Sequence, residues 1–267
     1  MVDTYIPILE IFFVVYASFI GHIYLCPHTI NRLLYIMPDS EKCWVAGLQN
    51  TGTNLVDNLL KKGDTCDVLE NRVNTEPTWK HRLLSESLLD PKEGIVDKTK
   101  TTNISILTRH PYCWAAGIQK APYEFAPLAS SFDKPVVIKN AGLTWKADSV
   151  GDAWNKYMQQ ALDFQTASKK RPEVNAAFVP YESLLDPTTG VRTLKEAFPN
   201  LSVVDVEKYR SVLEKPAKTH GKPRSLRDSR RAAETRCKED LTDAQIETLR
   251  KTVDPNLAAQ FKYGLGN

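Results

Sequence analysis

Several features that mark other protein classes are missing from this sequence of 267 residues. It has no internal repeat and no low-complexity tract, which argues against solenoid and disordered chains. Its formal net charge is only +3, so charge alone gives no reason to expect a nucleic-acid partner. The five cysteines form no Cys-x-x-Cys pair and no metal-ligand spacing, and we expect no metal site. We interpret the cysteines mainly as free thiols, with one disulfide in an oxidising lumen as the alternative.

The composition that is present is that of an ordinary globular protein. Hydrophobic residues make up 42% of the chain and charged residues 25%. The length suits one α/β domain with a sizeable buried core and a short appendage.

One long hydrophobic run lies near the N-terminus. Residues 5–25 are almost continuously apolar, interrupted only by Glu10 and His22. Roughly 20 apolar residues in a helix cross a bilayer core, so the run predicts a hydrophobic helix that anchors the chain in a membrane. It lacks a clear small-x-small cleavage site, which favours a signal anchor over a cleaved signal peptide or an interfacial helix. We therefore expect an anchor and linker in residues 1–41 and an α/β domain in residues 42–267.

The charges around this run bear on the orientation of the anchor. No lysine or arginine precedes it, whereas Arg32 and Lys42 follow it, which by the positive-inside rule favours a cytosolic position for the domain that follows. A single-pass protein with this domain in the Golgi lumen would need the opposite orientation, and both interpretations stay open. The sequon at Asn200 would settle the orientation if it carried a glycan, whereas the sequon at Asn103 lies in a predicted buried strand.

Predicted strands and helices alternate along the rest of the chain. This alternation predicts a single α/β domain with a mainly parallel sheet covered by helices on both faces. The predicted strands are Lys42–Gly47, Asn103–Thr108 and Val174–Val179. The predicted helices are Thr53–Lys62, one opening at Pro111, Val150–Ser168, Asp186–Phe198 and one after Thr242.

The loop after the first predicted strand runs from Gly47 to Asn54. A strand, a tight polar turn and a helix together direct backbone N–H groups toward an anion, and the helix dipole adds to that field. Gly52 lets the backbone approach phosphate oxygens closely, and the hydroxyls of Thr51 and Thr53 can donate. An ordinary turn and helix cap is the alternative. The spacing is P-loop-like, but Thr53 stands where a P-loop has lysine, which argues against a nucleoside triphosphatase.

Four later segments follow this loop in order. They are Trp79-Lys80-His81, Ser105–Trp114 with Arg109-His110-Pro111, Ala153–Tyr157 (AWNKY) and Val179–Pro187 (VPYESLLDP). With the loop, they resemble the sulfotransferases that use 3′-phosphoadenosine-5′-phosphosulfate (PAPS) as donor. The resemblance covers about residues 43–200. It implies that Arg109 contacts the 3′-phosphate and that the loop binds the 5′-phosphosulfate, through Asn50, Thr51, Gly52, Thr53 and Asn54.

The chain departs from the family pattern at two positions. Asn50 stands where many members carry a lysine, and Gly117 stands where many carry a serine that binds the 3′-phosphate. A non-catalytic nucleotide- or glycan-binding module is therefore the main alternative function, and a P-loop small-molecule kinase is a third.

Sulfuryl transfer also needs a base for the acceptor and a charge on the leaving phosphate. We expect His81 to act as the base and Lys80 to supply the charge that Asn50 does not. For His81 the alternative is a solvated helix residue. The acceptor would be an unidentified hydroxyl or amine of a glycan or small molecule. A basic run includes Lys222 and Arg224, which either close on the 3′-phosphate or belong to a solvated loop.

Overall fold

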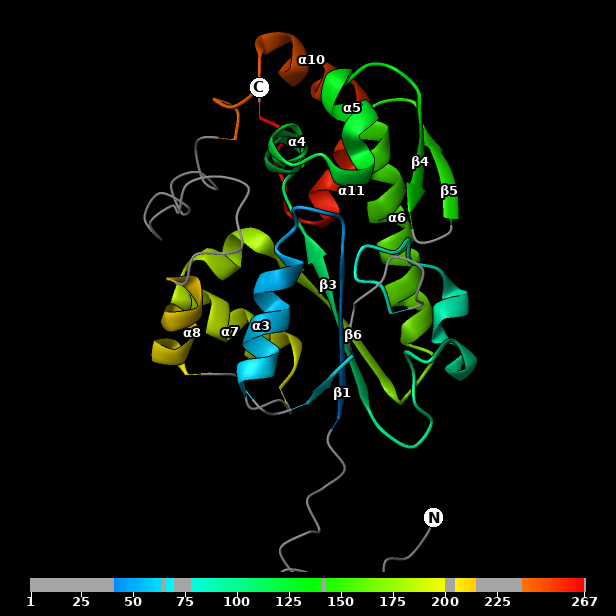
Figure 1. Ribbon diagram of the computed structural model, residues 1–267, viewed down its shortest axis with the longest axis vertical. Coiled ribbons are helices and arrows are strands. Elements are labelled where there is room, and N and C mark those ends of the chain that lie inside the picture. The colour runs from blue at the N-terminus through cyan, green and yellow to red at the C-terminus, as the bar shows by residue number, and fades with distance from the viewer. Residues whose placement is uncertain are drawn as a thin grey trace, which may run out of the picture. The chain divides into compact units, whose positions relative to one another are not determined.

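The computed structural model describes residues 41–63, 66–69, 78–140, 143–199, 205–214 and 237–266 (Figure 1). The predicted anchor, the sequon at Asn200 and the cofactor candidates Lys222 and Arg224 lie outside these residues. Within the described ranges, the helices are too short or too polar to span a bilayer.

The central sheet has four parallel strands in the order β2-β1-β3-β6. Their bounds are Lys42–Gly47 for β1, Asp67–Val68 for β2, Thr102–Thr108 for β3 and Val174–Pro180 for β6. The three predicted strands are confirmed to within a residue, and the α/β class with a mainly parallel sheet is confirmed. The two-residue edge strand β2 was not predicted because so short a segment has no periodicity.

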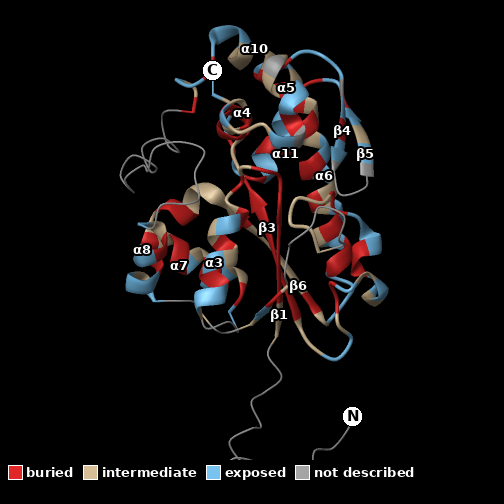
Figure 2. Ribbon diagram, in the orientation of Figure 1, coloured by how far each residue is buried: buried red, intermediate tan, exposed pale blue. Residues whose placement is uncertain are grey.

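Helices cover both faces of the sheet, and alternate strand residues face the two layers. On one face, Val45 and Leu107 pack with helices α3 (Thr53–Gly63), α7 (Pro187–Ala197) and α8 (Val206–Leu213). On the other face, Trp44 packs edge-on against Phe164 of α6 (Val150–Ser168), near the short helices η1 (Glu86–Leu89) and η2 (Pro91–Glu93). Figure 2 shows the buried residues gathered on the strands and on the inner sides of these helices.

A second group of elements gathers beyond the carboxyl ends of the strands (Figure 1). It contains α4 (Pro111–Lys120), η3 (Tyr123–Phe125), α5 (Ala126–Ser130), the antiparallel hairpin of β4 (Val136–Asn140) and β5 (Leu143–Ala147), α10 (Asp243–Thr252) and α11 (Pro255–Gln260). The short helix η4 (Tyr181–Leu185) follows β6. These elements surround the end of the sheet where the predicted motifs meet.

The predicted helix starts are confirmed by their caps. The side chain of Asp186 accepts a hydrogen bond from Thr189 N at the start of α7, with Pro187 at the first helical position. Thr242 and Gln245 form a reciprocal capping box at the start of α10. Each cap involves residues that are close together in sequence, so the sequence alone predicts these helix starts.

The interpretation of the cysteines as mainly free thiols is wrong. Cys43 in β1 pairs with Cys66 beside β2, and Cys113 in α4 pairs with Cys237. The partners are 23 and 124 residues apart in sequence. Only the fold brings their Cα atoms within disulfide distance, at 5.9 and 4.6 Å.

Candidate functional site

The site lies where the connections of the sheet change direction. From β1 the chain passes through α3 to β2 on one side, and then returns to β3 on the other side of β1. Open parallel sheets bind ligands outside the strand carboxyl ends at such a switch point. The loop after Gly47 leaves β1 here, and Arg109 follows β3, whose Leu107 is in register with Gly47.

The loop between β1 and α3 has a fixed internal geometry. Asn50 has a φ of 64° and Gly52 a φ of 87°, both in the left-handed region. A Cβ at residue 52 would collide with the ring of Tyr181, so glycine is required there for space as well as for backbone angle. The Thr51 hydroxyl donates to Leu48 O at 2.5 Å and so stabilises the turn itself. Thr53 is buried at the start of α3, whose first N–H groups have no earlier helical carbonyl to bond.

The predicted catalytic pair lies against this loop. Trp44 Nε1 donates to Thr78 O at 2.7 Å, and Gly47 N donates to Lys80 O at 2.8 Å. Nδ1 of His81 is 2.8 Å from Gly47 O, and Nζ of Lys80 donates to Asn54 Oδ1. His81 is half-buried in a turn, so its alternative interpretation as a solvated helix residue is wrong.

The protonation state of His81 follows from these contacts. Burial lowers the pKa of His81 to about 4, opposed by hydrogen bonds to the backbone of Gly47 and Leu48 and aided by the charge of Lys80. Because a carbonyl only accepts, Nδ1 carries the hydrogen, and Nε2 of the neutral ring carries the lone pair. Burial also lowers the pKa of Lys80, whereas the charge of Asp57 raises it.

Arg109 reaches the loop from the end of β3. Its Nη1 donates to Asn50 O, and its guanidinium carbon lies 4.7 Å from the centroid of the Tyr181 ring. Its Nε is buried and has no hydrogen-bond partner among the described residues. A buried donor without a partner is unusual in a folded protein, and a bound anion would satisfy it.

The two departures from the family pattern lie next to each other. Asn50 Nδ2 donates to Ala121 O at 2.9 Å, so the side chain turns toward the end of α4. A Cβ at Gly117 would come within 3.1 Å of both Arg109 Nη1 and Asn50 Cβ. Gly117 therefore provides the room in which Arg109 packs against Asn50.

Tyr181 joins the candidate site, although the sequence identified it only as part of a motif. Its ring lies close to both Gly52 and the guanidinium of Arg109. The available signal was its position as the first residue after β6, the strand next to β3.

Among the described residues, no three His, Cys, Asp or Glu side chains are grouped so that they could hold a metal ion. No protein-family model matches the chain, and no curated protein matches it.

Proposed function

We propose that this chain is a sulfotransferase, which moves a sulfuryl group from PAPS to a hydroxyl or amine of a glycan or small molecule. The observation that carries the proposal is the convergence of Gly52, His81 and Arg109 at the switch point between β1 and β3. Each contributes one of the three requirements of the reaction, which are a cradle for anions, a base and a cation for a second phosphate.

Donor binding divides between two parts of the site. The first turn of α3, with Thr53 and Asn54, would bind the 5′-phosphosulfate through backbone N–H groups. Lys80 bonds Asn54 and would supply the positive charge that Asn50 lacks. Arg109 would bind the 3′-phosphate with its planar fork, including the buried Nε.

The transfer step needs one proton acceptor. The acceptor oxygen or nitrogen attacks sulfur and loses its proton to Nε2 of His81. The bond between sulfur and the bridging oxygen breaks, and that oxygen keeps the electron pair on the 5′-phosphate. The hydrogen bond from Nδ1 to Gly47 O keeps the ring in the tautomer that can take the proton. Lys80 would stabilise the charge that develops on the leaving phosphate.

Localisation is part of the proposal. Two disulfides are typical of proteins that fold in an oxidising compartment, so we infer that the domain faces the secretory lumen, as in a Golgi enzyme. This inference opposes the orientation that Arg32 and Lys42 favour. A glycan on Asn200 of the chain made in eukaryotic cells would support it, and an unglycosylated chain with reduced cysteines would contradict it.

Ligand binding tests the assignment. The purified full chain is heated with adenosine 3′,5′-bisphosphate, with PAPS or with ATP, and its melting temperature is recorded. We expect both 3′-phosphorylated nucleotides to raise the melting temperature, because a ligand of the native state stabilises it. Stabilisation by ATP alone would instead support the kinase alternative. Binding of PAPS without sulfuryl transfer to any of a panel of sugars, phenols and amines would support the non-catalytic module.

A further inference from the structure

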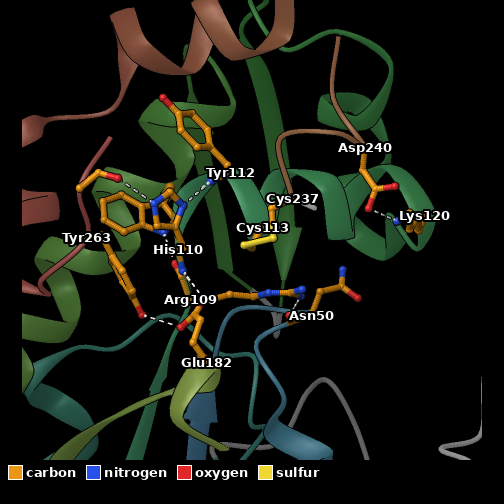
Figure 3. Close-up of a disulfide and its surroundings, with 12 residues drawn as sticks. Asn50, Arg109, His110, Tyr112, Cys113, Lys120, Glu182, Cys237, Asp240 and Tyr263 are labelled. Carbon is orange, nitrogen blue, oxygen red and sulfur yellow. Dashed lines mark hydrogen bonds and ion pairs between the residues drawn. A yellow bond between two sulfur atoms is a disulfide. The ribbon is translucent and has the colours of Figure 1, made fainter. Parts of the chain in front are cut away.

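The residues on either side of Arg109, Thr108 and His110, are hydrogen-bonded to Tyr263 and Glu182 from distant parts of the chain. Figure 3 shows the bonds that His110 and Tyr263 make to Glu182. Thr108 Oγ1 lies 2.9 Å from the hydroxyl of Tyr263, which lies 3.2 Å from Glu182 Oε2. The other carboxylate oxygen of Glu182 accepts from His110 N at 2.9 Å. The residues before and after Arg109 are thus both linked to the pair Glu182 and Tyr263.

The direction of these hydrogen bonds follows from their chemistry. A carboxylate only accepts, so Tyr263 donates to Glu182 and Thr108 donates to Tyr263. Burial and the charge of Glu182 raise the pKa of Tyr263 well above its usual value, so the phenol keeps its proton. The network therefore has one arrangement at neutral pH.

This network supports a weak point of the sheet. Thr108 is in register with Pro180 at the end of the β3–β6 ladder, and proline has no N–H to donate. Support for the turn at Arg109 comes instead from Glu182, from Tyr263 and from Trp154, whose Nε1 donates to Arg109 O at 3.0 Å.

The C-terminal segment (residues 237–266) that carries Tyr263 is attached to the same region at several points (Figure 3). His110 Nε2 donates to Gly264 O at 3.0 Å, and Tyr112 OH donates to Leu265 O at 2.9 Å. At its other end, the disulfide from Cys237 to Cys113 joins the segment to the first turn of α4. An ion pair between Asp240 and Lys120 adds a further contact with α4.

We infer that Tyr263 is a positioning residue for Arg109, through which the C-terminal segment sets the affinity of the site for a nucleotide 3′-phosphate. The inference rests on the proposed function, since it takes Arg109 as the group that binds this phosphate. Bidentate binding needs the guanidinium in one place, and a small shift of the Arg109 backbone displaces it from both Asn50 O and the ligand.

The test compares two buried tyrosines, of which Tyr263 is hydrogen-bonded to the residue before Arg109 and Tyr209 to Leu184. Tyr263→Phe removes the bridging hydroxyl and keeps the ring against His110 and Trp154. The matched control is Tyr209→Phe, because the Tyr209 hydroxyl donates to Leu184 O at 2.9 Å on the opposite face of the sheet. Binding of adenosine 3′,5′-bisphosphate and adenosine 5′-phosphate to the full chain is measured by calorimetry.

We expect Tyr263→Phe to weaken binding of the bisphosphate about fivefold to tenfold, the usual effect of one buried hydrogen bond, and to leave the 5′-phosphate unchanged. Tyr209→Phe should change neither. Equal losses for the two ligands, or equal losses in the two variants, would overturn the inference.

A second pair of variants changes the β3 residue of the same hydrogen-bond network, Thr108. Thr108→Val removes the other hydroxyl and should weaken bisphosphate binding to the same extent, and Thr108→Ser should restore it. If wild-type protein binds the bisphosphate no more tightly than the 5′-phosphate, the proposed role of Arg109 fails, and the inference fails with it. If wild-type protein discriminates and both Tyr263→Phe and Thr108→Val discriminate equally well, only the inference fails.

Discussion

At the scale of single residues, the contacts of His81 determine which of its ring nitrogens can accept a proton. The bond to Gly47 O assigns the hydrogen to Nδ1, and burial keeps the ring neutral well below the ordinary histidine pKa of about 6.5. A base that stays neutral at mildly acidic pH should keep its activity to a lower pH than an ordinary histidine would.

We predict that kcat/KM for sulfuryl transfer stays level as pH falls from 7 and declines only near the His81 pKa of about 4. The sign follows because the neutral ring is the active form and protonation below this pKa removes it. His81→Ala should lower the rate roughly 100- to 10,000-fold and abolish the acid limb. A pH–rate profile measures both effects. An acid limb unchanged in His81→Ala would show that another group is the base.

Gly52 combines two constraints at one position. Its φ of 87° is unfavourable for other residues, and a Cβ there would meet the Tyr181 ring. We predict that Gly52→Ala lowers the free energy of unfolding by more than about 1 kcal/mol and removes nucleotide binding.

Gly94→Ala is the matched control for Gly52→Ala. Gly94 has a similar φ of 79°, but a Cβ there would have no atom within 4 Å. In urea unfolding, the Gly94→Ala variant should lose only the free energy that the backbone angle costs. It should bind nucleotide normally. Equal behaviour of the two variants would mean that contact with Tyr181 is unimportant.

At the scale of secondary-structure elements, the segment from Thr78 to His81 is hydrogen-bonded alongside β1. Its backbone bonds to Gly47 and its carbonyl at Thr78 accepts from Trp44, so two strand residues fix where the base lies. Hydrogen bonds from the capping side chains likewise fix the residues at which α7 and α10 begin.

The capping box of α10 can be tested within one helix. We predict that Thr242→Ala lowers the free energy of unfolding by about 1 kcal/mol, because it leaves a first-turn N–H without its partner. Thr248→Ala in the middle of the same helix should cost little, since its hydroxyl bonds to Ala244 O, which already lies in the helix. Urea denaturation of both variants measures the difference. A loss in Thr248→Ala as large as that in Thr242→Ala would contradict a capping effect.

At the scale of the whole molecule, the two disulfides close loops of very different length. Cys43–Cys66 joins β1 to the residue before β2, whereas Cys113–Cys237 joins α4 to the C-terminal segment. Cross-links act mainly by restricting the unfolded chain, and longer loops are restricted more.

We predict that replacing both Cys113 and Cys237 by alanine lowers the free energy of unfolding more than replacing Cys43 and Cys66. From the separations of 124 and 23 residues, the losses are about 5 and about 3 kcal/mol on the loop-entropy model. Chemical denaturation of the two double variants gives the comparison. The first pair should also weaken bisphosphate binding, which the second pair should leave intact. The reverse order of stability would mean that strain or unfolded-state structure outweighs loop entropy.

Much of the fold was predictable because its signals are local. Alternating strands and helices, the Asp186-Pro187 start and the Thr242 capping box depend on residues a few positions apart. The candidate site was predictable in part for the same reason, since Gly52 and Arg109 each follow a recognisable strand. The environments of His81 and Tyr181 were not, because burial and ring contacts depend on elements that are remote in sequence.

The residue pattern along the chain is therefore enough to predict the α/β class, the main strands, and the loop and the arginine that follow two of these strands. The cysteine pairing, the ring nitrogen of His81 that bears the lone pair, and the bond of Tyr263 to the Thr108 side chain beside Arg109 all depend on how the chain packs. The physical reason is separation along the chain. Thr108 and Tyr263 are 155 residues apart, and no periodicity or motif records a contact that forms only when the sheet and the C-terminal segment have packed.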